Sequence, residues 1–318
     1  MAKRYPFGFP NSWYPVLYAD ELAPGELKTV HYFGQDLVVF RGASGRATCV
    51  DAYCPHIGAH FGHGGRVEGD NLRCPFHGWQ FDHTGKCVSI PYTDKIPPKA
   101  VAECWPTVER NGMIYVWYHA EKQPPFFEVP VIAQWGMEDW TRSYVKYGWK
   151  VRVHPQDIME NAIDWPHFTS VHKMDIPEDH GEKFDGPMFH WMIETNKTVQ
   201  TMENVRDHFR LEAQNWGMGF NFQTYTGMFA TMIAAGLTPI DDDYTWITFG
   251  VIGKNDGRTE DETRALLKAY MDDQSLAIQQ DFDIWENKAF QPRPALSDGD
   301  GPVGVYRKWT RQFYSTAW

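Results

Sequence analysis

Cysteine and long apolar runs are both scarce in this chain of 318 residues. It contains five cysteines, an odd number, and two of them lie in one short motif. We therefore expect no disulfide framework and a reducing, cytoplasmic environment. No stretch approaches the roughly 18 apolar residues that a membrane-spanning helix needs, so no membrane partner is expected. The first residues also lack the apolar core of a signal peptide.

Positive charge is in short supply as well. The 30 Lys and Arg residues are outnumbered by 41 Asp and Glu residues, which gives a net charge of −11. Nucleic acids and anionic membranes bind basic surfaces, so neither is expected as the main partner. A Gly-x-Gly-x-x-Gly fingerprint after a strand is missing, so NAD(P)H is not expected to bind this chain directly. What is present is a globular composition, with 42% hydrophobic residues and enough length for two domains.

Short apolar runs separated by Gly and Pro predict that residues 1–125 form an all-β domain. Within residues 27–42, two such runs flank Gly34-Gln35-Asp36, which indicates a hairpin. The Pro-rich stretch 121–130 has no periodicity and contains the domain boundary. We leave open that residues 1–20 pack on the second domain instead.

Residues 126–318 are predicted to form an antiparallel sheet covered by helices, a helix-grip arrangement, so the whole chain is α+β. Long β-type runs supply the strands, and two helical segments interrupt them. The first covers about 155–173, where Pro166 is expected to cause a local break. The second begins after Thr259, an N-cap followed by acidic residues, and runs to about Lys288.

The stretch CPHIGAHFGHGGRVEGDNLRCPFHGW, residues 54–79, contains two metal-binding motifs. They are Cys-x-His at Cys54 and His56, and Cys-x-x-His at Cys74 and His77. Two Cys and two His can hold zinc, but zinc fingers of this composition pair Cys with Cys and His with His. Here each half offers one of each. The pattern indicates a [2Fe–2S] cluster with thiolates on one iron and imidazoles on the other.

These loops resemble those of the Rieske proteins. The respiratory-complex branch of that family has an extra cysteine in each loop, and those positions are Ala59 and Phe76 here. The resemblance therefore points to Rieske ferredoxins and Rieske oxygenases. A ferredoxin would account only for the N-terminal domain, so the remaining residues need another function.

A second candidate metal site lies in residues 154–175. It contains His167 and His172, preceded by Asn161 and Asp164. Asn161, Asp164 and His167 are spaced three apart, so they share one side of a helix. Two His and one carboxylate with open positions form the facial triad of non-haem Fe(II) oxygenases. Taken alone, these histidines fit ordinary surface or core positions equally well.

The last predicted helix offers the missing carboxylate. Helical phase places Asp281 on the apolar, inward stripe, which also contains Ala277, Ile278, Ile284 and Trp285. Asp283 falls on the polar face, and we rank Asp272 and Asp273 below Asp281. A buried carboxylate needs a partner, and a metal ion is one. Asp281 is therefore the predicted third ligand.

With both motifs, nearly the whole chain resembles the oxygenase component of the Rieske non-haem iron oxygenases. In that family an Asp-x-x-His-x4-His motif and a later Asp bind the iron, which implies His167, His172 and Asp281 as ligands. Asp164 matches the family's bridging Asp, and Asn161 a nearby Asn. The segments WYPVLYADELAPGELKTVHYFGQDLVVFRG, DAYCPHIGAHFGHGG and DIWENK look most like the 3-ketosteroid 9α-hydroxylase oxygenase group, to which cholesterol 7-desaturases are related.

The resemblance also implies cofactors and partners. Each subunit would hold one [2Fe–2S] cluster and one mononuclear Fe(II), with electrons from an NAD(P)H-dependent flavin or iron–sulfur reductase and in some systems a ferredoxin. It implies a homotrimer in which Asp164 meets His56 or His77 of the neighbouring chain. Residues 222–237 are rich in Met, Phe, Ala and Gly, which suits the wall of a pocket for a bulky apolar ligand, although ordinary core strand explains most of these residues better. The resemblance, and not this composition, implies a steroid-like, polycyclic or aromatic substrate.

Other functions remain open on this sequence. A desaturase or an aromatic-ring dioxygenase would use the same scaffold. A pure Rieske electron carrier would have a docking domain as its second half and no mononuclear iron. A zinc-stabilised structural protein would give a colourless preparation.

Overall fold

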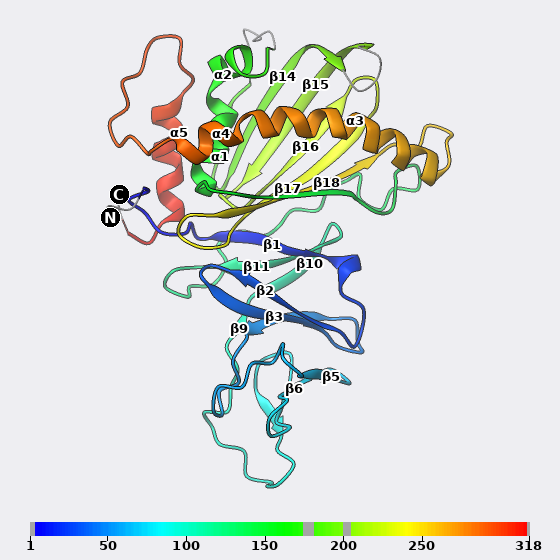
Figure 1. Ribbon diagram of the computed structural model, residues 1–318, viewed down its shortest axis with the longest axis vertical. Coiled ribbons are helices and arrows are strands. Elements are labelled where there is room, and N and C mark those ends of the chain that lie inside the picture. Colours follow the sequence, from blue (N-terminus) through cyan, green and yellow to red (C-terminus); the bar gives the residue numbers. More distant parts are fainter. Residues whose placement is uncertain (1–3, 174–180, 200–204, 317–318) are drawn as a thin grey trace. The chain divides into compact units, whose positions relative to one another are not determined.

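The computed structural model describes residues 4–173, 181–199 and 205–316 (Figure 1). The chain divides into two compact units. Trp13–Val129 forms the N-terminal unit, while the residues up to Ser12 and those from Pro130 onward form the C-terminal unit. None of the helices in the described part of the chain has the length and apolar character that crossing a membrane requires.

The N-terminal unit is built from three small sheets. Their strand orders are β1-β11-β10, β2-β3-β4-β9 and β5-β6-β7-β8. The strands are β1 (Ser12–Tyr18), β2 (Leu27–Tyr32), β3 (Gln35–Arg41), β4 (Ala47–Asp51), β5 (Arg66–Glu68), β6 (Asn71–Arg73), β7 (Gln80–Phe81), β8 (Cys87–Ser89), β9 (Cys104–Trp105), β10 (Thr107–Arg110) and β11 (Met113–Tyr118), with the 3₁₀ turn η1 (Ala19–Glu21) after β1. The all-β prediction for this part of the chain is confirmed.

The β2–β3 hairpin is confirmed, but its turn lies earlier than predicted. The turn residues are Phe33 and Gly34, with φ values of 55° and 72°. Two consecutive positive φ values suit a tight hairpin, because that backbone matches the right-handed twist of the strands. Phe33 stacks on Trp105 and Tyr118, and these contacts hold a bulky residue in a conformation that normally favours glycine.

The C-terminal unit contains a seven-stranded antiparallel sheet in the order β12-β18-β17-β16-β15-β14-β13. The strands are β12 (Val145–Val151), β13 (Lys183–Asp185), β14 (Met188–Val199), β15 (Val205–Trp216), β16 (Phe220–Thr226), β17 (Thr231–Pro239) and β18 (Thr245–Gly253). Helix α3 (Glu260–Gln280) crosses one face of this sheet (Figure 1). Leu267, Tyr270 and Met271 of α3 pack there on Phe249 and Val251 of β18.

The first predicted helical segment is broken, as expected from Pro166. It forms α1 (Pro155–Glu160), the 3₁₀ turn η2 (Asn161–Ile163) and α2 (Trp165–Ser170). Proline has no N–H, so position 166 cannot continue the hydrogen-bond ladder of the preceding turn. Asp164 lies in the break, with a non-helical ψ of 78°.

The second predicted helix begins as expected and ends differently. Thr259 and Glu262 form a capping box at the start of α3. At Asp281 the ladder changes, because its N–H donates to the carbonyls of Ile278 and Gln279, and a separate helix α4 (Phe282–Asn287) follows. Ile284, predicted to face inward, is 47% exposed, whereas Trp285 of the same predicted stripe is 4% exposed, as expected. The prediction for Ile284 is wrong.

The chain termini complete the C-terminal unit. Helix α5 (Val303–Thr310) and the turn η4 (Arg311–Phe313) follow α4. Near the start of the chain, Tyr5 and Phe7 pack with Phe290, and the Tyr5 hydroxyl donates to Asp157 at 2.8 Å. The N-terminal segment therefore packs on this unit until β1 begins at Ser12.

Candidate functional site

Two loops of the N-terminal unit carry the first group of candidate ligands, and they have the same backbone geometry. Each cysteine N–H donates to the carbonyl five residues later, from Cys54 to Ala59 and from Cys74 to Trp79, at 2.8 Å in both. Each glycine four residues after the cysteine donates back to the cysteine carbonyl. These glycines, Gly58 and Gly78, have φ values of 82° and 72°. Such a turn strains any residue with a Cβ, which explains Cys-Pro-x-x-Gly in both loops.

The cysteines of this site are more deeply buried than the histidines. Cys54 and Cys74 are 3% and 2% exposed, and both belong to the hydrophobic core of the unit. His56 and His77 are half-buried, with ring centroids 4.8 Å apart. The structure thus brings together all four predicted residues, with the thiols inside and the imidazoles toward the surface. This is the arrangement that a cluster with two sulfur and two nitrogen ligands requires.

The chemistry of these groups fits a metal cluster. Burial and the neighbouring Cys74 raise the pKa of the Cys54 thiol to about 12, so a thiolate here needs positive charge beside it. The Nδ1 atom of His77 is buried and has no hydrogen-bond partner in the described part of the chain, and a bound iron would be such a partner. Both observations fit iron ligands better than ordinary core residues.

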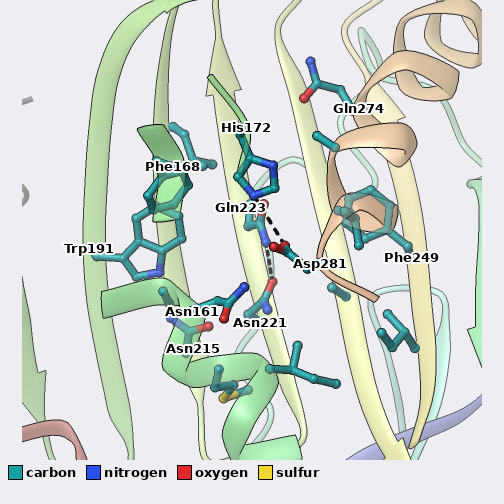
Figure 2. A pocket seen from close by; sticks show the side chains of 18 of the residues that line it. Asn161, Phe168, His172, Trp191, Asn215, Asn221, Gln223, Phe249, Gln274 and Asp281 are labelled. Atoms are coloured by element: carbon teal, nitrogen blue, oxygen red, sulfur yellow. Dashed lines mark hydrogen bonds and ion pairs between the residues drawn. The ribbon is translucent and has the colours of Figure 1, made fainter. Parts of the chain in front are cut away.

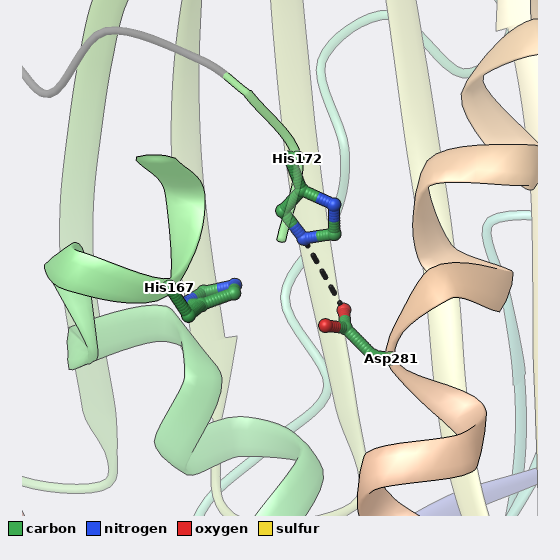
Figure 3. Close-up of side chains that lie close together, drawn as sticks. All are labelled: His167, His172 and Asp281. Carbon is green, nitrogen blue, oxygen red and sulfur yellow. Dashed lines mark ion pairs between the residues drawn. The ribbon is translucent and has the colours of Figure 1, made fainter. Parts of the chain in front are cut away.

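The second group lies in the C-terminal unit (Figure 3). His167 is on α2, His172 follows it, and Asp281 lies where α3 meets α4. Their ligand atoms all lie within 4.8 Å of one another, and no other group of three or more His, Cys, Asp or Glu among the described residues is this close. His172 Nε2 is 3.4 Å from Asp281 Oδ2. The cysteines and histidines of the N-terminal loops thus do not converge on one ion-sized point.

Hydrogen bonds orient both imidazoles toward a common point. His167 Nδ1 donates to the backbone carbonyl of Asp164, and His172 Nδ1 donates to Gln280 Oε1 at 3.0 Å. Because a carbonyl oxygen only accepts, each ring must carry its proton on Nδ1, which leaves Nε2 without a proton and able to act as a ligand. Burial lowers the pKa of His167, which favours the neutral imidazole, the form that binds metals.

The other candidate carboxylates of this region face elsewhere. Asp283 is exposed and accepts from the side chain of Asn287. Asp272 pairs with Lys268 at 2.9 Å, and Tyr147 donates to it at 2.8 Å. Asp273 is buried but is not part of the cluster. Asp281, at 7% exposure, is the one that meets the two histidines.

The two remaining predicted site residues have different surroundings. The Asn161 amide oxygen accepts from the Trp285 indole at 3.2 Å, which links η2 to α4 below the cluster. The Asp164 carboxylate is half-buried and has no hydrogen bond or ion pair to any residue in the described part of the chain. The structure therefore does not bring Asp164 to His167 through its side chain, although its backbone carbonyl holds that ring.

A cavity opens beside His167, His172 and Asp281 (Figure 2). The cavity opens to solvent, and its empty volume of about 1100 Å³ includes the space at its mouth. Apolar residues from the sheet and helices make up much of the wall, among them Phe168, Ile193, Leu211, Ala235, Leu237, Ile247 and Phe249. From the predicted wall 222–237, Gln223, Tyr225, Ala235 and Leu237 line the cavity.

Sequence reasoning missed several residues of these sites. Gln280 orients His172, and Trp79 stacks on His56 with ring centroids 4.2 Å apart. The cavity wall also contains the uncharged polar side chains of Asn215, Asn221, Gln223 and Gln274. The alternation of Asn221, Gln223 and Tyr225 along β16 was a usable signal, because residues two apart share one face of a strand.

Two protein families match the chain, one in each part. The Rieske [2Fe-2S] domain family matches residues 12–106. The family of the 3-ketosteroid 9alpha-hydroxylase C-terminal domain matches residues 116–314.

Curated relatives match over nearly the full chain. A 3-ketosteroid-9-alpha-monooxygenase oxygenase component of Rhodococcus rhodochrous is 32% identical, over 98% of this chain and 83% of the relative. The cholesterol 7-desaturase of Caenorhabditis elegans is also 32% identical, over 96% and 77%. Cholesterol 7-desaturase nvd 1 of Ciona intestinalis is 31% identical, over 96% and 69%.

Solved structures of lower identity share the fold. NdmA of Pseudomonas putida CBB5 with caffeine superposes with a TM-score of 0.73 at 19% identity, covering 94% of this chain and 89% of the other. Dicamba monooxygenase bound to dicamba gives 0.72 at 17% identity, covering 96% and 97%.

Proposed function

Because this chain belongs to the 3-ketosteroid 9α-hydroxylase family of Rieske oxygenases, as an oxygenase component, we propose that it hydroxylates a bulky apolar, steroid-like substrate. The observation that carries the proposal is the cluster of His167, His172 and Asp281 at the wall of a large apolar cavity. In an oxygenase the metal must meet the substrate, and here the candidate ligands and the cavity share one wall.

The metals are assigned to the two groups of residues described above. Cys54, His56, Cys74 and His77 are the ligands of the [2Fe–2S] cluster, and His167, His172 and Asp281 are the ligands of a mononuclear Fe(II). When bound, these groups supply one-electron transfer and O2 activation. The chain holds the ligand atoms in place through Gln280 and the Asp164 carbonyl, and its apolar cavity orients the substrate and excludes water.

Electrons reach an oxygenase component from a separate reductase. We infer that this reductase is an NAD(P)H-dependent flavin or iron–sulfur protein, with or without a ferredoxin. We further propose a homotrimer, in which the Asp164 carboxylate pairs with a cluster histidine of the neighbouring chain. The absence of any Asp164 side-chain partner among the described residues supports a partner outside the chain. Five unpaired cysteines support a reducing, cytoplasmic location.

A second reaction, desaturation, is favoured by one specific observation. Cholesterol 7-desaturases are as similar to this chain as the steroid monooxygenase, at 31–32% identity. Both reactions remove hydrogen from an unactivated carbon of a fused-ring lipid and need the same cavity. The aromatic-ring dioxygenase alternative has no comparable support.

The test is turnover with labelled oxygen. Purified protein, a bacterial flavin/iron–sulfur reductase and NADH are incubated with a 3-keto steroid or cholesterol under ¹⁸O2. Incorporation of one ¹⁸O atom identifies hydroxylation, loss of two hydrogens without label identifies desaturation, and two labelled atoms identify dioxygenation. If reductase consumes NADH and the cluster cycles but no steroid changes mass, the substrate proposal is wrong.

A further inference from the structure

The sheet face that lines the cavity contains an island of polar side chains. The register of the strands places Trp191 of β14 opposite Ala213 of β15, and Ala213 opposite Gln223 of β16. In the neighbouring row, Asn215 lies opposite Asn221. Side chains directly opposite are about 5 Å apart, and all four polar residues line the cavity on one face of the sheet, around the small Ala213.

Trp191 carries the strongest signal in this island. The residue is 6% exposed, and its indole N–H is buried and finds no hydrogen-bond partner among the residues that the structure describes. An unsatisfied buried donor costs about 1–3 kcal/mol, so native proteins rarely keep one unless a ligand or water pairs with it. The indole is a donor and never an acceptor. Whatever pairs with Trp191 therefore presents an acceptor atom.

The amides of the island are only partly engaged by the chain itself. Gln223 Nε2 donates to Asn221 Oδ1 at 2.9 Å, and Asn215 Nδ2 donates to the Phe189 carbonyl at 3.3 Å. The Gln223 carbonyl oxygen and the Asn221 amide nitrogen have no such partner among the residues described. Figure 2 shows the side chains of Trp191, Asn215, Asn221 and Gln223 around the same cavity. Together they offer hydrogen bonds without charge.

Charge in the cavity wall is confined to the metal site. Among the residues described, Asp281 is the one acidic side chain that lines the cavity, and no Lys or Arg lines it. His167 and His172 lie with Asp281 at the metal site. Away from that site, a charged group of a substrate would lose its hydration without finding a counter-charge. A neutral ligand with one oxygen acceptor can bind beside these polar side chains without the desolvation cost of a charged group.

We propose that Trp191, with Gln223 and Asn221 two strands away on the same sheet face, selects substrates that carry a neutral oxygen acceptor, a ketone or hydroxyl, on an otherwise apolar ring skeleton. The indole N–H donates to that oxygen, and the amides complete its hydrogen bonds. This fixes which end of the skeleton lies against β14–β16 and so which carbon faces the metal ligands. The inference rests on the proposed function for the ring skeleton and adds to it the group that is recognised.

The test compares a steroid hydrocarbon with its ketones on the metal-loaded protein. Dissociation constants are measured by equilibrium dialysis for 5α-androstane, 5α-androstan-3-one and 5α-androstan-17-one. Trp191→Phe keeps the ring and removes the donor. It should weaken binding of one ketone about tenfold, the equivalent of one lost hydrogen bond, and change androstane binding less than about twofold.

Two further variants control this comparison. Trp309→Phe removes an indole N–H of the same unit that already donates to the Gly186 carbonyl, outside the cavity, and should leave all three constants unchanged. Gln223→Met keeps length without the amide and should weaken the same ketone selectively. It tests the island even if Trp191→Phe does not fold. Iron and sulfide content verifies that each variant is intact.

The possible results distinguish a failure of oxygen recognition from a failure of the proposed steroid function. Suppose that Trp191→Phe and Gln223→Met weaken binding of the ketone and of the hydrocarbon to the same extent, or change neither affinity. The island then does not select the oxygen, and the indole either pairs with a retained water or acts through its shape. The steroid assignment would survive that result. If the wild-type protein binds none of the three compounds, both the inference and the steroid assignment are wrong.

Discussion

The two candidate metal sites are built in opposite ways. In the N-terminal unit, four ligands come from two loops with the same backbone turn, one between β4 and β5 and the other between β6 and β7. In the C-terminal unit, two ligands come from a broken helix and the third from a helix far along the chain, brought close only because both pack on the same sheet. The first site is a local motif, whereas the second is a product of tertiary structure. Each site should therefore fail for its own reasons.

The largest effect is expected from Cys74→Ser, which removes a thiolate from the cluster loops. We expect loss of the red-brown colour and of all turnover with a reductase, because a serine oxygen replaces a required sulfur ligand. The iron bound by the C-terminal unit should remain, since that unit has its own core. Absorption spectra and metal analysis check this. Cys104→Ser, at a half-buried cysteine whose thiol meets the His83 carbonyl, should keep the spectrum.

Asp281→Ala should break the other site and spare the cluster. Loss of a ligand should reduce affinity for the mononuclear iron by about 100-fold or more, beyond what mutation of supporting residues usually costs, and should abolish turnover. The cluster absorption should be unchanged. Asp283→Ala, two residues away and exposed, is the matched control and should change neither. If the two variants behaved in the reverse way, Asp281 would not be the ligand.

Asp164→Asn tests whether the two sites cooperate. The change keeps the shape and the backbone carbonyl that holds His167, but removes the charge that we assign to a bridge with a neighbouring chain. Both metals should stay bound, while reoxidation of the reduced cluster by O2 and substrate slows at least about tenfold, a barrier increase of about 1.4 kcal/mol. Single-turnover stopped-flow absorption measures this rate. Wild-type reoxidation with full iron would remove Asp164 from the electron path.

The smallest effect is expected from Gln280→Leu, which removes the acceptor for His172 Nδ1. The ring then loses its fixed tautomer and orientation, so iron affinity should fall about tenfold while the cluster stays intact. Gln279→Leu is the matched control, because Gln279 bonds the Ser275 carbonyl of its own helix. Titration of the metal-free C-terminal site with Fe(II) compares the two. Equal affinities would show that Gln280 does not support the site.

The same contrast between a local and a tertiary site explains which site residues could be predicted from the sequence. The cluster loops could be recognised because residues 54–79 contain both the candidate ligands, at their characteristic spacing, and the glycines of the turns. Helical phase predicted that Asp281 faces inward, and its side chain is buried beside the two histidines. Beyond Asp281 the phase held for Trp285, which is buried, but not for Ile284, which is exposed. Residue spacing alone gives no tertiary distance.

The order of the seven strands and the polar island in the cavity could not be predicted. Trp191, Asn215 and Gln223 belong to three strands, and they meet only through the register of β14, β15 and β16. The sequence stretch 222–237 indicated an apolar wall because its Met, Phe and Ala residues outnumber its amides. Which of those side chains face the cavity depends on strand pairing, since one residue of slippage reverses the face.

Iron stoichiometry is the most direct test of whether one chain holds two separable iron sites. We expect three irons and two acid-labile sulfides per chain, from a [2Fe–2S] cluster and one Fe(II). Mild chelation should remove one iron, abolish turnover and leave the cluster spectrum intact, and added Fe(II) should restore activity. Two irons per chain with nothing removable, or zinc in a colourless protein, would contradict it.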